Sequence, residues 1–206
     1  MHLLITAGGT REYIDPVRFI TNASSGKMGY ALAGAAQKAG HKVMLISASD
    51  LQPPVGVEFV GVDSAAEMFE AVKKHFPRCD CLIMAAAVSD YAPVKQAKSK
   101  IKKTDKPLTI KLKPTADILK WAGRHKKKAQ FIVGFALEDR AIRTQAEKKL
   151  KEKNLDMIIA NTPAAIGSDK TSVQIKTPGG KWLRLSTAAK SSTAGRIIKL
   201  IETSKF

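Results

Sequence analysis

The sequence predicts an α/β protein with a Rossmann-like, doubly wound and mostly parallel sheet. Three observations lead to this fold class. Apolar runs alternate with helix-like segments through most of the chain, as in proteins built from βαβ units. The run at 42–47 is almost continuously apolar, which is typical of a parallel strand buried on both faces. A glycine turn after the first apolar run precedes a Ser-Ser-Gly helix start, a combination suited to binding anions.

The first half of the chain is predicted to form four strands and two helices. A helix from Lys27 to Ala39 is expected to stop at Gly40, because glycine commonly ends helices. A second helix is expected to reach about His75, and it begins where Ser64 and Glu67 form a capping box. The strands are expected at residues 3–5, 42–47, 58–62 and 79–86.

The pattern changes after Tyr91. Residues 92–107 carry Pro and Lys but few apolar side chains, which predicts an exposed, mobile lid loop. A half-buried strand is expected at 108–112, and a short helix at 116–126 with Thr115 as its N-cap. The later elements are predicted as a strand at 130–135, a charged helix at 141–153, a strand at 157–160, a hairpin at 172–185 and a helix at 187–203. The loop and the hairpin are interpreted as excursions from a single domain over residues 1–206.

Composition places the chain among soluble globular proteins. Its 206 residues are 44% hydrophobic, and no apolar stretch approaches the roughly 20 residues that span a bilayer. The N-terminus lacks the features of a signal peptide, because Gly8-Gly9 and Arg11-Glu12 interrupt it early. Cys79 and Cys81 have no second Cys or His pair at ligand spacing, so we interpret them as buried thiols. We therefore expect a cytoplasmic protein.

The net charge of +17 is the compositional outlier. Residues 95–128 hold thirteen Lys or Arg side chains against Asp105 and Asp117. Such a field attracts polyanions, either nucleic acid or a small anion such as a nucleoside triphosphate. A solvated, lysine-rich loop explains the same pattern without a ligand.

Residues 15–29 are the stretch most indicative of function. Glycines let a phosphate approach the backbone, and free N–H groups at a helix start complement its charge. Ser24 and Ser25 can cap this helix and also donate hydroxyl groups. Each piece has a simpler interpretation, since Gly8-Gly9 can be an ordinary tight turn and Ser-Ser-Gly an ordinary N-cap. Small residues at 85–87 would leave room for a ligand at the end of a strand.

Six strings between Leu3 and Asn161 carry a family resemblance, and they read ITAGGTREYIDPVRFITNASSGKMGYALA, AAAVSDYAP, KIKK, ADIL, VGFALED and KNLDMIIAN. In sequence and order they resemble the phosphopantothenoylcysteine synthetase family, the second activity of the coenzyme A biosynthesis enzyme. Family members commonly carry a flavin-dependent decarboxylase domain on the N-terminal side. Since Met1 lies directly before the synthetase strand, we expect a stand-alone synthetase, with a separate decarboxylase as a candidate partner.

The resemblance implies a two-step ligase. A nucleoside triphosphate activates the carboxylate of 4′-phosphopantothenate as an acyl-nucleotidylate, and the amine of L-cysteine then attacks the acyl group. Bacterial members use CTP and eukaryotic members use ATP. The Asn-x-Ser-Ser-Gly-Lys-Met-Gly string resembles bacterial members, which favours CTP and an acyl-cytidylate. Mg²⁺ is expected as the cofactor that neutralises the triphosphate.

The resemblance also implies roles for individual residues. Asn22 matches an asparagine that holds the substrate or acyl carbonyl. Arg18 matches an arginine that reaches phosphopantothenate across a dimer interface, which predicts a homodimer; the alternative for Arg18 is a surface salt bridge with Asp15 or Glu12. Lys100 matches the catalytic lysine of a mobile lid, with three further lysines between 98 and 103 close enough to substitute for it. The positions that match substrate-contacting backbone are Ala86 and Ala87. The positions that match the nucleotide site are Gly9, Ser24, Gly26, Gly29, Asp90, Lys100, Asp117, Ile118, Leu119, Phe135, Lys149, Lys153 and Asn161.

Two other function classes fit parts of the sequence. A basic nucleic-acid-binding module would explain the charge, but residues 92–128 contain a single aromatic side chain for stacking, Trp121. An NAD(P)-dependent oxidoreductase would explain the Rossmann-like start. Its G-x-G-x-x-G fingerprint does not match the spacing of Gly8-Gly9.

Overall fold

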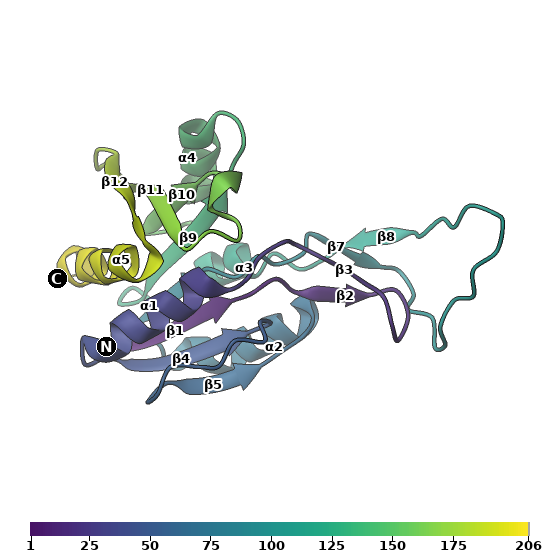
Figure 1. Ribbon diagram of the computed structural model, residues 1–206. Helices are drawn as coiled ribbons and strands as arrows, with labels where there is room; N and C mark the ends of the chain where they lie inside the picture. Colours follow the sequence, from purple (N-terminus) through teal and green to yellow (C-terminus); the bar gives the residue numbers. More distant parts are fainter. Residues whose placement is uncertain (206) are drawn as a thin grey trace.

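One eight-stranded sheet organises the computed structural model, which describes residues 1–205 (Figure 1). The strand order is β12-β11-β10-β9-β6-β1-β4-β5. The six parallel strands are β1 (His2–Ala7), β4 (Lys42–Ser47), β5 (Glu58–Gly61), β6 (Cys81–Met84), β9 (Phe131–Leu137) and β10 (Met157–Asn161). Taken in chain order, these six lie in the 3-2-1-4-5-6 arrangement of doubly wound folds, so the predicted fold class is confirmed.

An antiparallel hairpin extends the sheet beyond β10. It consists of β11 (Lys170–Lys176) and β12 (Leu183–Ala189), and β11 pairs with β10. The hairpin predicted at 172–185 is therefore present. The following helix, α5 (Lys190–Lys205), starts three residues later than the predicted 187, because residues 187–189 still belong to β12.

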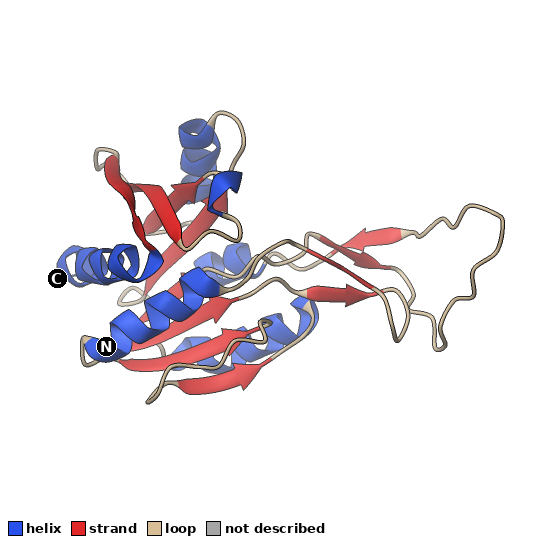
Figure 2. Cartoon of the chain, viewed as in Figure 1, coloured by secondary structure: helices blue, strands red, loops and turns tan. Residues whose placement is uncertain are grey.

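Five α-helices cover the two faces of the sheet (Figure 2). One face carries α1 (Lys27–Lys38) and α5, which lie side by side. The other carries α2 (Ala65–His75), α3 (Ile118–His125) and α4 (Ile142–Glu152). Two 3₁₀ turns occur at Phe76–Arg78 and Pro163–Ala165.

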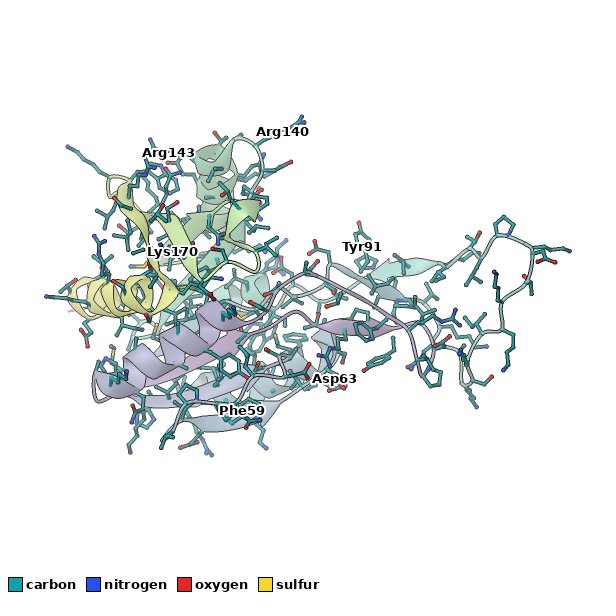
Figure 3. The ribbon with its side chains drawn as sticks, in the orientation of Figure 1. Phe59, Asp63, Tyr91, Arg140, Arg143 and Lys170 are labelled. Atoms are coloured by element: carbon teal, nitrogen blue, oxygen red, sulfur yellow. The ribbon has the colours of Figure 1, made fainter. Side chains whose placement is uncertain are left out.

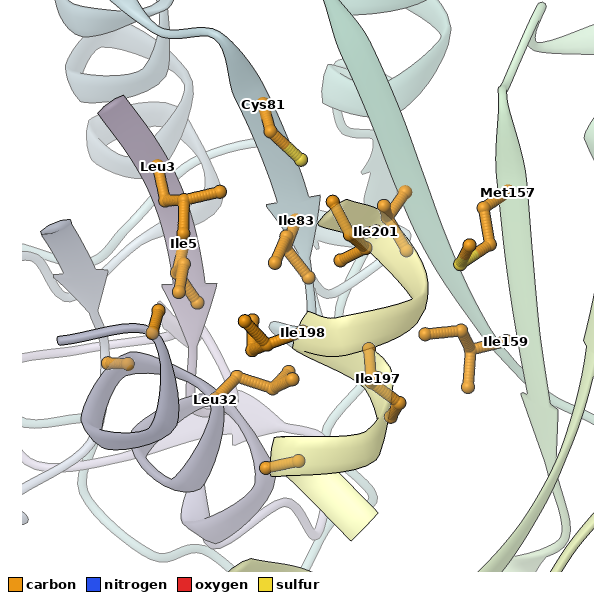
Figure 4. Close-up of a cluster of buried hydrophobic side chains, with 14 of the residues drawn as sticks. Leu3, Ile5, Leu32, Cys81, Ile83, Met157, Ile159, Ile197, Ile198 and Ile201 are labelled. Atoms are coloured by element: carbon orange, nitrogen blue, oxygen red, sulfur yellow. The ribbon is translucent and has the colours of Figure 1, made fainter. Parts of the chain in front are cut away.

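The core forms two layers because successive strand residues point to opposite faces. Leu3 and Ile5 of β1 pack under α1 and α5, where Leu32 and Ile198 lie on the side of Ile5 (Figure 4). Leu4 packs into the opposite layer. Cys79 and Cys81 are buried, as predicted.

Local capping explains where the helices of the second face begin. Ser64 Oγ accepts a hydrogen bond from the backbone N–H of Glu67, which confirms the predicted capping box. At α3 the prediction of Thr115 as N-cap is wrong, because the N-cap is Asp117, whose carboxylate accepts from the N–H of Lys120 at 2.9 Å. Thr115 instead donates its hydroxyl to the carbonyl of Ser89.

Four short strands and a long loop form an arm that projects from the carboxyl edge of the sheet (Figure 1). The arm consists of the antiparallel pair β2 (Arg11–Tyr13) and β3 (Phe19–Thr21), the antiparallel pair β7 (Tyr91–Pro93) and β8 (Leu112–Pro114), and the loop 94–111. Figure 3 shows Tyr91 on this arm, away from the helices.

The predicted boundaries in the arm need correction. The lid loop was predicted at 92–107, but residues 92 and 93 belong to β7 and the loop continues to 111. The strand predicted at 108–112 is wrong in register, because only Leu112 to Pro114 find a partner in β7. Leu108 remains 58% exposed, so the alternation around it does not reflect burial. Within residues 1–205, no helix is long and apolar enough to cross a membrane.

Gly123 and Gly195 give a matched pair of substitutions that tests the helix packing. A Cβ atom on Gly123 would lie 1.8 Å from the backbone oxygen of Lys153, whereas one on Gly195 would meet nothing within 4 Å. We expect Gly123→Ala to lower the free energy of unfolding by about 1–3 kcal/mol through overpacking. Gly195→Ala should raise it by about 0.5–1 kcal/mol, because glycine is unfavourable inside a helix. Denaturant titration followed by circular dichroism measures both, and effects of equal sign would contradict this packing.

Candidate active site

A cleft of about 540 Å³ opens at the carboxyl ends of the parallel strands. Its walls come from the loop before α1, the segment after β6, the starts of α3 and α5, one side of α4, and the turn between β10 and β11. It lies beside the neighbouring strands β1 and β6, where the strand order reverses and open α/β sheets bind their ligands. Most of the predicted site residues line it, namely Asn22, Ser24, Gly26, Gly29, Ala86, Ala87, Asp90, Asp117, Ile118, Leu119, Phe135, Lys149, Lys153 and Asn161.

Glycine allows α1 to start directly against β1. A Cβ atom on Gly29 would lie 2.5 Å from the Cβ of Ala7, and one on Gly26 would lie 2.8 Å from the Cβ of Ser49. Gly26 has a φ of +76° and is itself the N-cap of α1, without a side-chain hydrogen bond to the first turn. The expectation that Ser24 or Ser25 caps this helix is therefore wrong. The first-turn N–H groups of α1 consequently face the cleft without a serine cap, which suits an anion.

Gly9 lies outside the cleft lining, in a shallower depression on the other side of residues 22–25. It forms an isolated parallel β-bridge with Ala87. A Cβ atom on Gly9 would lie 2.6 Å from the backbone oxygen of Asn22. Gly9 thus lets the chain at residue 22 approach the end of β1.

Asn22 is held at the mouth of the cleft by the segment that follows β6. Its side-chain nitrogen donates to the carbonyl oxygens of Ala87 at 3.2 Å and Val88 at 3.1 Å. The amide therefore lies beside Ala86 and Ala87, the positions predicted to contact substrate. A ligand carbonyl that binds this amide nitrogen would replace one of the two backbone acceptors.

Lys149 of α4 and Lys153, the C-cap of that helix, reach the cleft, and each has its own carboxylate partner. Lys153 Nζ lies 2.9 Å from Asp117 Oδ2, and Lys149 pairs with Glu138. Because the lysines are four residues apart, they share one face of the helix. Asp117 therefore serves both as the N-cap of α3 and as the counter-ion of Lys153.

Arg18 and Lys100 do not line this cleft, since Arg18 lies in the turn that joins β2 to β3 of the arm and Lys100 lies in the loop 94–111. Arg18 donates through Nε and Nη to Asp15, and its guanidinium also donates to the carbonyl of Ile101, at 2.6 Å. The same Asp15 carboxylate accepts from the backbone N–H of Ile101 at 3.1 Å. The residue after Lys100 is thus anchored to the turn that carries Arg18.

Asp15 is the fully buried centre of this anchor. Burial alone would raise the pKa of its carboxyl group. Hydrogen bonds from the side chain of Arg18 and from the N–H groups of Val17, Ile101 and Arg18 outweigh burial and hold the pKa well below its usual range. The carboxylate therefore stays charged and holds the loop at neutral pH.

Sequence reasoning assigned nothing after Asn161, yet the far wall of the cleft comes from that region. Its residues are Ala165, Ile166, Gly167, Thr171, Val173 and Lys190. They reach the cleft because β11 pairs back onto β10 and α5 returns beside α1. Lys190, at the start of the last helix, was the one local feature of the sequence that could have indicated a site residue in this region.

Comparison with known proteins identifies relatives whose matched region includes every segment that lines the cleft. The family profile described as the DNA/pantothenate metabolism flavoprotein C-terminal domain matches residues 1–204, so the resemblance extends beyond Asn161. The chain is 47% identical over 206 residues to the coenzyme A biosynthesis bifunctional protein CoaBC of Bacillus subtilis, covering 97% of this chain and 50% of that protein. It is 42% identical to a cysteine/cysteine sulfinic acid decarboxylase from an unknown prokaryotic organism, covering 98% and 58%. The chain thus spans about half the length of the curated relatives it matches.

A solved structure agrees with these matches. The crystal structure of the C-terminal domain of CoaBC is similar to this chain with a TM-score of 0.85 and 42% sequence identity. The alignment covers 98% of this chain and 94% of that domain.

The Asp15 anchor makes a testable prediction about loop 94–111. A carboxyl group whose pKa falls on folding stabilises the folded chain above its unfolded pKa of about 3.9, and this contribution is lost as the pH falls through the folded value. Asp15→Asn removes the charge at neutral pH, so we expect trypsin to cleave the loop about tenfold faster. Asp105→Asn removes a charge from an exposed position of the same loop and serves as the control. Mass spectrometry of the fragments gives the rates, and similar rates for both variants would exclude the anchor.

Proposed function

The chain belongs to the family of the DNA/pantothenate metabolism flavoprotein C-terminal domain, and we propose that it acts in coenzyme A biosynthesis as the ligase that joins 4′-phosphopantothenate to L-cysteine. The observation that carries the proposal is the composition of one cleft. Residues from five of the six strings, far apart in sequence, line it together. The CoaBC relatives and the C-terminal CoaBC domain support the same pathway.

The proposed reaction has two steps with charge developing on phosphoryl and acyl oxygens. A carboxylate oxygen of 4′-phosphopantothenate attacks the α-phosphorus of CTP and releases pyrophosphate. The cysteine amine then attacks the acyl-cytidylate, forms the amide and releases CMP. Fixed N–H donors and lysines suit both steps, because they stabilise developing negative charge without reorganising.

The described cleft residues can be assigned to these steps. The first turn of α1, which has Gly26 and no serine as its N-cap, would bind the phosphate groups of the nucleotide. The amide of Asn22 would hold the acyl oxygen next to Ala86 and Ala87. The nucleoside would lie toward Phe135, Lys149 and the start of α3, as the resemblance implies.

Mg²⁺ fits this cleft as an ion held mainly by the nucleotide. Among residues 1–205 no group of three or more His, Cys, Asp or Glu side chains could hold a metal ion by itself. Mg²⁺ usually keeps several waters and binds through one or two carboxylates together with substrate phosphates. Asp90 lines the cleft and would supply such a carboxylate, whereas Asp117 is paired with Lys153. When bound, the ion would neutralise triphosphate charge.

A homodimer would bring the arm to a second cleft. Arg18 and Asp15 both contact Ile101, the residue next to Lys100. The side chains of Arg18 and Lys100 would therefore reach a second cleft together. We propose that Arg18 reaches the phosphate of phosphopantothenate in the cleft of a second copy. Lys100 would act on the acyl-cytidylate in that same cleft, since its neighbour is anchored beside Arg18.

Product formation tests the proposed reaction directly. The purified chain with 4′-phosphopantothenate, L-cysteine, CTP and Mg²⁺ should form phosphopantothenoylcysteine together with one CMP and one pyrophosphate per product. Chromatography with mass detection measures all three. Faster turnover with ATP would contradict only the choice of CTP, and absence of product with either nucleotide would contradict the ligase.

The same assay separates the ligase from a decarboxylase. One relative is named as a decarboxylase, and this chain matches 58% of it. Release of CO₂ from cysteine without nucleotide, in place of amide formation, would favour that activity. The ligase requires nucleotide and releases no CO₂.

Mixed dimers test which residues act across the interface. Arg18→Ala and Asn22→Ala should each be inactive, but together they should recover up to about a quarter of wild-type activity, because about half of randomly formed dimers are hybrids with one intact cleft. Arg18→Ala mixed with Lys100→Gln should recover none if both residues come from the same arm. Recovery in this second mixture would place Lys100 in its own chain's cleft. A monomer by sedimentation would remove the dimer proposal.

A further inference from the structure

Two lysines without an assigned role line the cleft at its far wall, Lys190 as part of that wall and Lys27 through its ion pair with Asp169. Lys27 is the first residue of α1 and Lys190 is the first residue of α5. Both line the cleft, and the two helices lie side by side (Figure 1). The chain therefore brings two ammonium groups and two positive helix ends to the same wall.

One carboxylate, that of Asp169, pairs with Lys27 and acts on the Lys190 ammonium group only through its charge. Lys27 Nζ lies 2.6 Å from Asp169 Oδ1. Lys190 Nζ donates to the carbonyl oxygen of Ala165 at 3.1 Å, and its backbone N–H donates to the carbonyl of Asp169. The Asp169 side chain is 85% exposed, so water screens its attraction for both lysines.

The balance of charge differs from that at the other end of the cleft. Lys149 and Lys153 each have a carboxylate of their own, Glu138 and Asp117. At the far wall, Asp169 pairs with Lys27, and the ammonium group of Lys190 donates to a backbone carbonyl. An excess positive charge therefore remains at the far wall.

The charge of Lys27 also acts on the pKa of Lys190. Burial and then the nearby charge of Lys27 lower the pKa of its ammonium group, and the attraction of Asp169 does not compensate. An anion placed between the two lysines would relieve their repulsion. A phosphoryl group can accept hydrogen bonds from both ammonium groups at once.

We infer that Lys27 and Lys190 form a phosphoryl-anion subsite, which takes the diphosphate end of the nucleotide and the pyrophosphate released from it. Asp169 is the counter-ion that the phosphate displaces from Lys27. The subsite itself rests on the cleft geometry, and the identity of the phosphate rests on the proposed ligase function. A diphosphate fits better than a single phosphate ester, because it carries enough charge and length to meet both lysines and the first turn of α1 at Gly26.

Binding of inorganic pyrophosphate to the full chain tests the subsite without turnover. Isothermal titration calorimetry should detect binding to the wild type. We expect Lys190→Gln to weaken it about tenfold, because one charge-assisted contact is lost. Lys199→Gln removes a charge from an exposed position of the same helix, outside the cleft, and should leave the affinity unchanged. Lys190→Arg keeps the charge and should retain most of the affinity. This variant also controls for loss of the contact to Ala165.

Asp169→Asn provides a test with the opposite sign. If Asp169 competes with the anion for Lys27, its removal should tighten pyrophosphate binding by about threefold. Weaker binding in this variant would show that Asp169 positions Lys27, which would overturn its role as a displaced counter-ion. Equal losses in Lys190→Gln and Lys199→Gln, or no binding of pyrophosphate to the wild type at millimolar concentration, would overturn the subsite.

A second titration separates the two sources of phosphate. With 4′-phosphopantothenate as the probe, Lys190→Gln should bind as the wild type does. Loss of phosphopantothenate binding with unchanged pyrophosphate binding would assign the subsite to the phosphate ester and overturn the diphosphate assignment. Both titrations give a result whether or not the chain catalyses amide formation, so failure of the subsite and failure of the ligase proposal remain distinguishable.

Discussion

The close approach of α1 to the end of β1 is the constraint on which the site depends. Gly29 leaves no room for a side chain against Ala7, and Gly26 leaves none against Ser49. This approach fixes the first turn of α1 at the point where the strand order reverses. The cleft forms around that turn. A larger residue at Gly29 would push the helix away from the strand and would move its N–H groups together with Lys27 at its first position.

Two carboxylates, those of Asp15 and Asp117, hold arginine and lysine side chains in defined positions. Asp15 is buried and ties Arg18 to the backbone of Ile101. Asp117 caps α3 and orients Lys153. Each carboxylate joins elements distant in sequence, so a loop lysine or arginine keeps a defined position without a strand or helix around it. The cost of burying Asp15 is offset by the number of hydrogen bonds that it accepts.

Lysines that contribute to the large net charge lie in two environments, the cleft and the arm. In the cleft, Lys149, Lys153 and Lys27 each pair with a carboxylate, while Lys190 donates to the carbonyl oxygen of Ala165. In the arm, Lys98, Lys100 and their neighbours are exposed. A field of this sign raises the local concentration of anionic substrates at the carboxyl edge of the sheet. It therefore agrees with small phosphorylated ligands as well as with the polyanions that composition alone would suggest.

The sequence by itself determined the features that depend on neighbouring residues. The strand at 42–47 has the predicted bounds because a strand buried on both faces is apolar throughout. The capping box at Ser64 was visible because its two partners lie three residues apart. The string around Asn22 also predicted a helix start, and the structure places that helix start at the cleft.

Tertiary structure alone decided the features that depend on distant partners. The strands β2 and β3 are three residues long, too short to show periodicity, and they exist because they pair with each other. The register of β8 follows from β7, twenty residues earlier in the chain. Lys190 enters the cleft only because an antiparallel hairpin turns the chain back beside α1. Periodicity and capping are encoded within a few residues, whereas the order of strands in a sheet is set by burial across the whole chain.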